Sequence, residues 1–152
     1  MPPMTLEQIS DRIEIDDLLT RYTVAIDEKD WNKLDTCFTA DAKVDYTTSG
    51  GIKGEYPEVR AWLEKALAPF TMTQHLISNT TVTIVGDSAT SRTYVYNPMG
   101  VPKEDGSLHI FTVGAYYNDK LVRTADGWRI AERFEEQAFM EGSFPENLQI
   151  PS

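Results

Sequence analysis

The hydrophobic pattern of this chain changes period part-way along its length, and that change is what most limits its fold. Up to residue 67, apolar residues recur mainly at helical spacing; from residue 71 onward, β-branched and aromatic residues form long runs separated by tight turns. Helices followed by a meander of strands predict an α+β domain in which a curved sheet wraps over the helices. A bent sheet closed by a helix leaves a conical hollow, a common shape for a small-molecule site.

The helical part is predicted to contain three helices. The first should run over 6–27, with Thr5 and Gln8 forming a capping box. Its apolar stripe consists of Leu6, Ile9, Ile13, Leu18, Tyr22 and Ile26. Asp30 can cap a second, shorter helix with Trp31, Leu34 and Phe38 on one face, and a third helix is predicted over 56–67, before Pro69.

The strand-rich part is predicted to form four long antiparallel strands. These cover 71–85, 89–97, 108–123 and 128–139, and a further strand over 42–47 lies between the second and third helices. Pro98 is expected to end the second long strand, and Gly114 to mark a bulge in the third. One domain is therefore expected over 1–140, followed by an irregular tail over 141–152.

Charge and composition exclude several classes of protein. The chain has 152 residues, with 24 acidic and 14 basic side chains and a net charge of −10. No basic stripe is visible, so neither a nucleic acid nor an anionic membrane surface is expected as a partner, and we interpret the acidity as favouring solubility. The sequence has no apolar run of ~18 residues and no secretory signal, so a cytoplasmic protein is predicted.

Few side chains are suited to catalysis near neutral pH. There is no glycine-rich phosphate loop, no H-E-x-x-H and no paired C-x-x-C, and two histidines are too few for a multi-histidine metal site. Cys37, beside Phe38, is expected to be a buried structural thiol. His109 lies near a hairpin turn and is expected at a solvent-exposed rim, which leaves His75 as the ordinary base.

Asp27 is a candidate partner for His75. It closes the apolar stripe at the C-terminal end of the first helix, where a carboxylate faces the negative end of the helix dipole at a cost of ~0.3–1 kcal/mol. One interpretation is a solvated residue within the charged run 27–30. The other is a carboxylate that orients His75 and fixes its tautomer, giving a general base that typically contributes ~10²–10⁴-fold in rate.

Tyrosines form a second group of candidates. Tyr22 lies on the first helix and Tyr46 in the first strand, both of which should line the hollow, while Tyr96 and Asn97 end the second long strand. Core packing would account for most of them. A phenol facing a dry cavity could instead donate to a carbonyl or developing enolate oxygen, and Asn97 could add a neutral polar contact.

Several segments together resemble the NTF2-like superfamily in its SnoaL-like branch. They are IEIDDLLTRY at 13–22, AIDEKDW at 25–31, FTADA at 38–42, TQH at 73–75, ATSRTY at 89–94 and GWRI at 127–130. That branch includes scytalone dehydratase, bile-acid 7α-dehydratase and hexachlorocyclohexane dehydrochlorinase. The resemblance implies a cone-shaped fold around a central pocket.

The resemblance also implies roles for individual residues. Asp27 and His75 resemble the aspartate–histidine pair of several eliminating members, and Tyr22 and Tyr46 resemble their pocket tyrosines. The dehydratases carry a further His or Asp on the next strand, where this chain has Tyr96-Asn97. The implied function is a cofactor-independent lyase acting on a hydrophobic cyclic small molecule, with no metal and with a homodimer formed through the sheet face.

Other functions remain compatible with the same sequence. The pocket could bind a ligand without turnover, the fold could support an isomerase or cyclase, or the domain could serve protein interactions. An Asp27 carboxylate within hydrogen-bond reach of a His75 ring nitrogen, both facing a cavity, would favour the enzyme. A filled interior beneath an exposed apolar sheet would favour the interaction domain.

Overall fold

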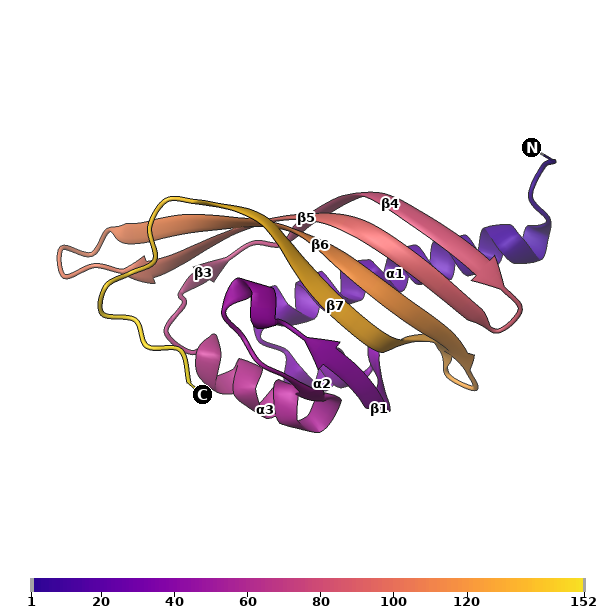
Figure 1. The fold of residues 1–152 in the computed structure, drawn as a ribbon, viewed down its shortest axis with the longest axis horizontal. Coiled ribbons are helices and arrows are strands. Elements are labelled where there is room, and N and C mark those ends of the chain that lie inside the picture. Colours follow the sequence, from indigo (N-terminus) through magenta and orange to yellow (C-terminus); the bar gives the residue numbers. More distant parts are fainter. Residues whose placement is uncertain (1, 152) are drawn as a thin grey trace.

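The structure is a computed structural model that describes residues 2–151, so residues 1 and 152 of the predicted domain and tail lie outside it. Its helices are α1 (Leu6–Glu28), α2 (Trp31–Asp35) and α3 (Tyr56–Ala66), with a short 3₁₀ turn η1 (Thr47–Ser49). Its strands are β1 (Phe38–Asp45), β2 (Lys53–Glu55), β3 (Met72–Thr73), β4 (Leu76–Val85), β5 (Ser88–Pro102), β6 (Leu108–Thr124) and β7 (Gly127–Glu141). The predicted α+β fold, a strongly curved sheet against helices, is confirmed (Figure 1).

The strands form one seven-stranded sheet in the order β2-β1-β7-β6-β5-β3, with β4 also paired to β5. Every pair is antiparallel except β1 and β7, which are parallel. The expectation of an antiparallel sheet is therefore wrong for the β1–β7 pair. A hairpin forces antiparallel pairing only on strands joined by a short turn, and β1 and β7 are far apart in the sequence.

Helix α1 is only partly buried. Its capping box is confirmed, since Gln8 N donates to Thr5 Oγ1 (3.2 Å) and Thr5 N to Gln8 Oε1 (2.8 Å). The C-terminal half of the predicted stripe is core, but Leu6, Ile9 and Ile13 are exposed. The helix has 23 residues and is about 34 Å long, so its first turns extend to the edge of the molecule, beyond the apolar core (Figure 1).

Two predicted boundaries are wrong for identifiable reasons. Phe38 is the first residue of β1 and does not continue α2. Its ring stacks on that of Tyr56, with ring centroids 4.5 Å apart. Pro98 does not end β5, which runs on to Pro102. The Pro98 carbonyl accepts from Gln74 N (3.0 Å), so its backbone faces the break between β3 and β4 and no hydrogen bond to β6 is lost.

The bulge predicted at Gly114 is confirmed, because the β6–β7 register shifts between Gly114 and Ala115. Gly114 pairs with Phe139, and a Cβ built on Gly114 would lie 2.0 Å from the Phe139 ring. The glycine therefore allows the aromatic ring to lie directly over the strand. The bulge adds curvature to the long strands that enclose the helices.

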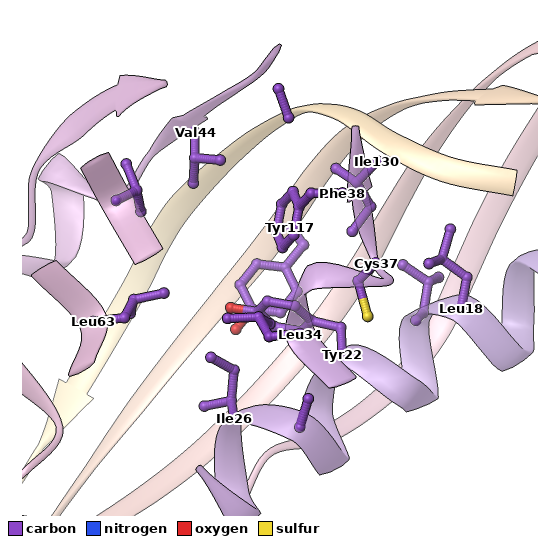
Figure 2. Close-up of a cluster of buried hydrophobic side chains, with 14 of the residues drawn as sticks. Leu18, Tyr22, Ile26, Leu34, Cys37, Phe38, Val44, Leu63, Tyr117 and Ile130 are labelled. Carbon is purple, nitrogen blue, oxygen red and sulfur yellow. The ribbon is translucent and has the colours of Figure 1, made fainter. Parts of the chain in front are cut away.

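The core lies between the inner face of the sheet and the helices. Figure 2 shows part of it, in which Tyr22, Leu34, Cys37 and Tyr117 come from different elements and pack together. Cys37 is fully buried and free, as predicted, and burial raises the pKa of its thiol. Within residues 2–151, no helix is long and apolar enough to cross a membrane.

Candidate active site

Asp27 and His75 are in hydrogen-bond contact, one at the end of α1 and the other between β3 and β4. Asp27 lies in the last turn of α1, which ends at Lys29 in the left-handed conformation. His75 lies between β3 and β4, where the chain leaves its pairing with β5. The predicted proximity of the two residues is thus set by a helix end and by a break in the sheet.

The two residues make two contacts. His75 Nδ1 lies 2.6 Å from Asp27 Oδ1, and the His75 backbone N–H donates to Asp27 Oδ2 at 2.8 Å. An ionised carboxylate only accepts hydrogen bonds, so Nδ1 carries the proton and Nε2 is the nitrogen left for a ligand. The His75 side chain is 8% exposed and that of Asp27 23%, so the pair is held at the edge of the interior.

Asn97 holds the same turn from β5. Its Nδ2 donates to the Gln74 carbonyl (2.9 Å) and to Thr73 Oγ1 (3.1 Å), and it lies 3.5 Å from His75 Nδ1. These contacts fix the backbone on both sides of the turn that carries His75. Asn97 also lines the cavity.

Tyr22 and Tyr46 form a buried pair of phenols. Their hydroxyl oxygens are 2.7 Å apart, so one hydroxyl donates to the other and the pair has at most one further proton to offer a ligand oxygen. Burial raises the pKa of both phenols, which keeps them protonated as donors at neutral pH. The Tyr22 ring also lies edge-on to the His75 ring, with centroids 6.5 Å apart.

A buried ion pair between Arg133 and Asp119 packs against the tyrosine rings. Arg133 and Asp119 have fully buried side chains and are joined by two hydrogen bonds of 2.8 and 2.7 Å. The guanidinium stacks over the rings of Tyr22 and Tyr117, at 4.0 and 3.9 Å from the ring centres. This arrangement fixes the orientation of Tyr22 and places a positive charge beneath the phenols.

These side chains share one cavity of about 120 Å³. Its polar lining is Tyr22, Tyr46, Ser49, His75, Asn97, Tyr117 and Glu135. Its apolar lining includes Leu63 and Leu67 at the α3 end, Phe111 of β6, and Phe144 and Ile150 of the C-terminal tail. For comparison, a dry cavity of about 150 Å³ binds benzene, so the space matches a single small ring.

The tail over 142–151 has no helix or strand, and it contributes to the lining of the cavity. It runs from the end of β7 past the β5–β6 hairpin toward α3 (Figure 1). Trp62 Nε1 donates to the Pro151 carbonyl (2.7 Å), and the Phe144 ring packs on Phe111 with centroids 5.4 Å apart. His109, half-buried, lies outside this cavity with Nε2 2.6 Å from the Ser143 carbonyl.

Tyr96 is a correction to the predicted site. It is 45% exposed and does not line the cavity. Side chains alternate between the faces of a strand, and Val95 and Asn97 on either side of Tyr96 are buried. Tyr96 therefore points to the outer face of the sheet, and of this neighbouring pair only Asn97 reaches the site.

Sequence reasoning missed Glu135 and Tyr117. Both line the cavity from the inner face of the sheet, on β7 and β6. Burial raises the pKa of the Glu135 carboxyl. The alternation of β7 around Arg133 and Phe134 could have indicated the direction of Glu135, but its distance from His75 depends on the curvature of the whole sheet.

Within residues 2–151, no group of three or more His, Cys, Asp or Glu side chains could hold a metal ion.

Both sequence and structure comparisons match the chain to known proteins. The model of the SnoaL-like domain matches residues 7–134. The chain belongs to the SnoaL-like family. An uncharacterized protein of Mycobacterium tuberculosis strain H37Rv, Rv2910c, is 42% identical over 138 residues, which cover 91% of this chain and 92% of that protein.

Solved structures share the same fold. A scytalone dehydratase-like protein from Novosphingobium aromaticivorans DSM 12444 has a TM-score of 0.82 at 19% identity, covering 94% of each chain. A type 2 hexachlorocyclohexane dehydrochlorinase, LinA, has a TM-score of 0.77 at 18% identity, covering 93% of this chain and 98% of the other. At these identities the likeness concerns the SnoaL-like fold alone, and function must be argued from the site.

Proposed function

We propose that this SnoaL-like protein is a cofactor-independent lyase that eliminates a leaving group from a hydrophobic cyclic small molecule. The observation that carries the proposal is the double contact of Asp27 with the ring and backbone of His75 beside a largely apolar cavity. A histidine held in one tautomer, with its second nitrogen free, is suited to act as a general base. The single-ring size of the cavity favours a small cyclic substrate.

Each polar group has a role in this reaction. His75 Nε2 takes a proton from the carbon next to a carbonyl, and Asp27 stabilises the imidazolium that forms. The further phenol proton of the Tyr22–Tyr46 pair donates to the carbonyl oxygen as negative charge develops on it. The electron pair left on carbon forms the C=C bond, and the leaving group departs with the electrons of its bond to the neighbouring carbon.

The first prediction tests the base with two variants. Probes are cyclohexanones that carry a hydroxyl or a chloride β to the carbonyl, and enone formation is followed by ultraviolet absorbance above the uncatalysed rate. His75→Gln removes the base and Asp27→Asn removes its orienting carboxylate, so each should lower kcat/KM by about 10²–10⁴-fold. Turnover that survives His75→Gln unchanged would contradict the proposal.

A matched control separates this effect from a general loss of charge. Glu28→Gln removes the carboxylate of the residue that follows Asp27 in the chain. The Glu28 side chain is 60% exposed and paired with Lys33. It should leave kcat/KM within about twofold of wild type, because exposed ion pairs contribute little. Saturable binding of the probes without turnover would favour the alternative of a non-catalytic ligand-binding module.

The remaining sequence predictions belong to the same proposal. A homodimer through the sheet face would cover exposed apolar residues such as Tyr94, Tyr96 and Phe134. A cytoplasmic location belongs to this proposal, as does a hydrophobic small-molecule ligand, which the largely apolar lining of the cavity supports.

A further inference from the structure

Glu135, on β7, places a carboxyl group in the same cavity as His75. On β7, Arg133 is buried, Phe134 is 40% exposed on the outer face, and Glu135 lines the cavity. Thr48 fixes this part of the strand, since its Oγ1 donates to the Glu135 carbonyl (2.6 Å) and accepts from Gln137 N (2.9 Å). The inward direction of the Glu135 side chain is therefore set by its backbone.

No ion pair among the described residues accounts for this carboxyl, although hydrogen bonding by Ser49 and Tyr117 lowers its pKa against the larger effect of burial. The cation beside it, Arg133, is already bound by both carboxylate oxygens of Asp119. Within residues 2–151, Glu135 takes part in no ion pair. The titratable and polar groups that share its surroundings are Tyr22 of α1, Tyr46 after β1, Ser49 of η1, His75, Tyr117 of β6 and Arg133.

The pKa values of two adjacent glutamates, Glu135 and Glu136, shift in opposite directions. Burial raises the pKa of Glu135, so its proton is retained to higher pH than on an exposed glutamate. The pKa of Glu136 is lowered by its hydrogen bond to Arg92 on the outer face, at 2.7 Å. The contrast shows that burial on the inner face, and not the strand itself, raises the pKa of Glu135.

We infer that Glu135 is the general acid of the site and that the leaving group of the substrate is a hydroxyl. This inference rests on the proposed lyase function. Hydroxide is a poor leaving group and needs a proton as the C–O bond breaks, whereas chloride departs as a stable anion. An acid in the cavity is therefore required for dehydration and is superfluous for loss of a halide.

The step balances with these two groups. His75 Nε2 takes the proton from carbon, the C–H electron pair forms the C=C bond, and the C–O bond breaks as Glu135 gives its proton to the departing oxygen. The products are an enone and water, beside a His75 imidazolium and a Glu135 carboxylate. Transfer of one proton from His75 to Glu135, directly or through water, restores the starting state.

Other polar side chains of the cavity are less suited to this role. Burial raises the pKa of Tyr46 well above that of an ordinary phenol, which makes it a far weaker acid than a carboxyl. The Asn97 amide has no acidic proton, and its Nδ2 is already bonded to Gln74 and Thr73. The acid expected by resemblance on the strand after His75 is thus supplied here from β7.

The second prediction compares the two β-substituted cyclohexanones on wild type, Glu135→Gln and His75→Gln. Glu135→Gln keeps the shape of the side chain and removes its proton, so kcat for the hydroxy ketone should fall by about 10²-fold or more. Its kcat for the chloro ketone should stay within about threefold of wild type, while His75→Gln should lose both reactions. Glu136→Gln, the same change on the outer face, should alter neither.

The outcomes separate this inference from the function on which it rests. Equal effects of Glu135→Gln on both ketones, or an effect on KM alone, would overturn the acid role while leaving the lyase intact. Loss of neither reaction in His75→Gln, or no reaction by wild type, would overturn both. Independently of turnover, carbon-13 NMR of labelled glutamate carboxyls should show one resonance, missing in Glu135→Gln, that titrates above the others; its absence would also overturn the inference.

Discussion

At the scale of single residues, one carboxylate holds both the ring and the backbone of one histidine. Asp27 could be chosen from the sequence because a carboxylate at a helix C-terminus is unfavourable unless another group stabilises it. His75 could be chosen because the chain has only two histidines. Glu135 could not, since it is one of many glutamates and no spacing connects it to His75. What brings it into the cavity is the curvature of the sheet.

A third prediction concerns the stability cost of Glu135. Its pKa is raised in the folded state, so the folded protein holds this proton more tightly than the unfolded chain. The contribution of Glu135 to stability is therefore full at low pH and declines as pH rises above the ordinary glutamate value toward the folded pKa. Glu135→Gln should lack this decline and unfold at higher denaturant concentration than wild type at pH 7.

The measurement is urea unfolding of both proteins between pH 4 and pH 8, with the difference in unfolding free energy plotted against pH. That difference should grow with pH in favour of the variant. A difference independent of pH would contradict burial of a titrating carboxyl. Stabilisation combined with lost dehydration is the trade-off typical of a strained active-site group.

At the scale of elements, the three helices and the long strands followed from the hydrophobic period, whereas β2, the break between β3 and β4, the strand pairing and the exposure did not. The parallel contact of β1 with β7 depends on how the chain returns after the β-meander, which no local pattern encodes. The exposure of Leu6, Ile9 and Ile13 depends on how far the sheet extends along α1. Pro98 continues its strand because the neighbouring strand is interrupted at that position.

A fourth prediction tests the close approach of Phe139 to Gly114. Gly114→Ala places a methyl group within the Phe139 ring, so this 47% exposed ring must shift and the unfolding free energy should fall by about 1 kcal/mol, the lower end of the range for overpacked sites. In a Phe139→Ala background, the same change should cost less than about 0.5 kcal/mol, because the obstructing ring is gone. The double-mutant cycle is measured by urea unfolding, and additive effects would contradict the proposed contact.

At the scale of the whole molecule, the last residues of the chain complete the cavity. The sequence indicated that the tail is irregular but gave no sign of where it lies, because its position depends on single contacts made by Trp62 and Phe144. Since Phe144 and Ile150 line the same cavity as His75, movement of the tail would enlarge the space open to a ligand.

A fifth prediction addresses this movement. Trp62→Phe keeps an aromatic ring and removes the hydrogen bond to the Pro151 carbonyl, which should cost about 0.5–1.5 kcal/mol of tail docking. Amide hydrogen exchange of residues 143–150 should accelerate by about two- to tenfold, while exchange in β5 and β6 stays unchanged. Uniform acceleration over the whole chain would indicate global destabilisation instead of release of the tail.

The wall formed by the tail also links occupancy of the cavity to protection of the C-terminus. A compound that fits against Phe144 and Ile150 binds the docked tail better than the released one, so it must shift the tail toward docking by the ratio of those affinities. Resistance of the last residues to a carboxypeptidase then reports binding directly. Candidate substrates can be ranked in this way before any reaction has been observed.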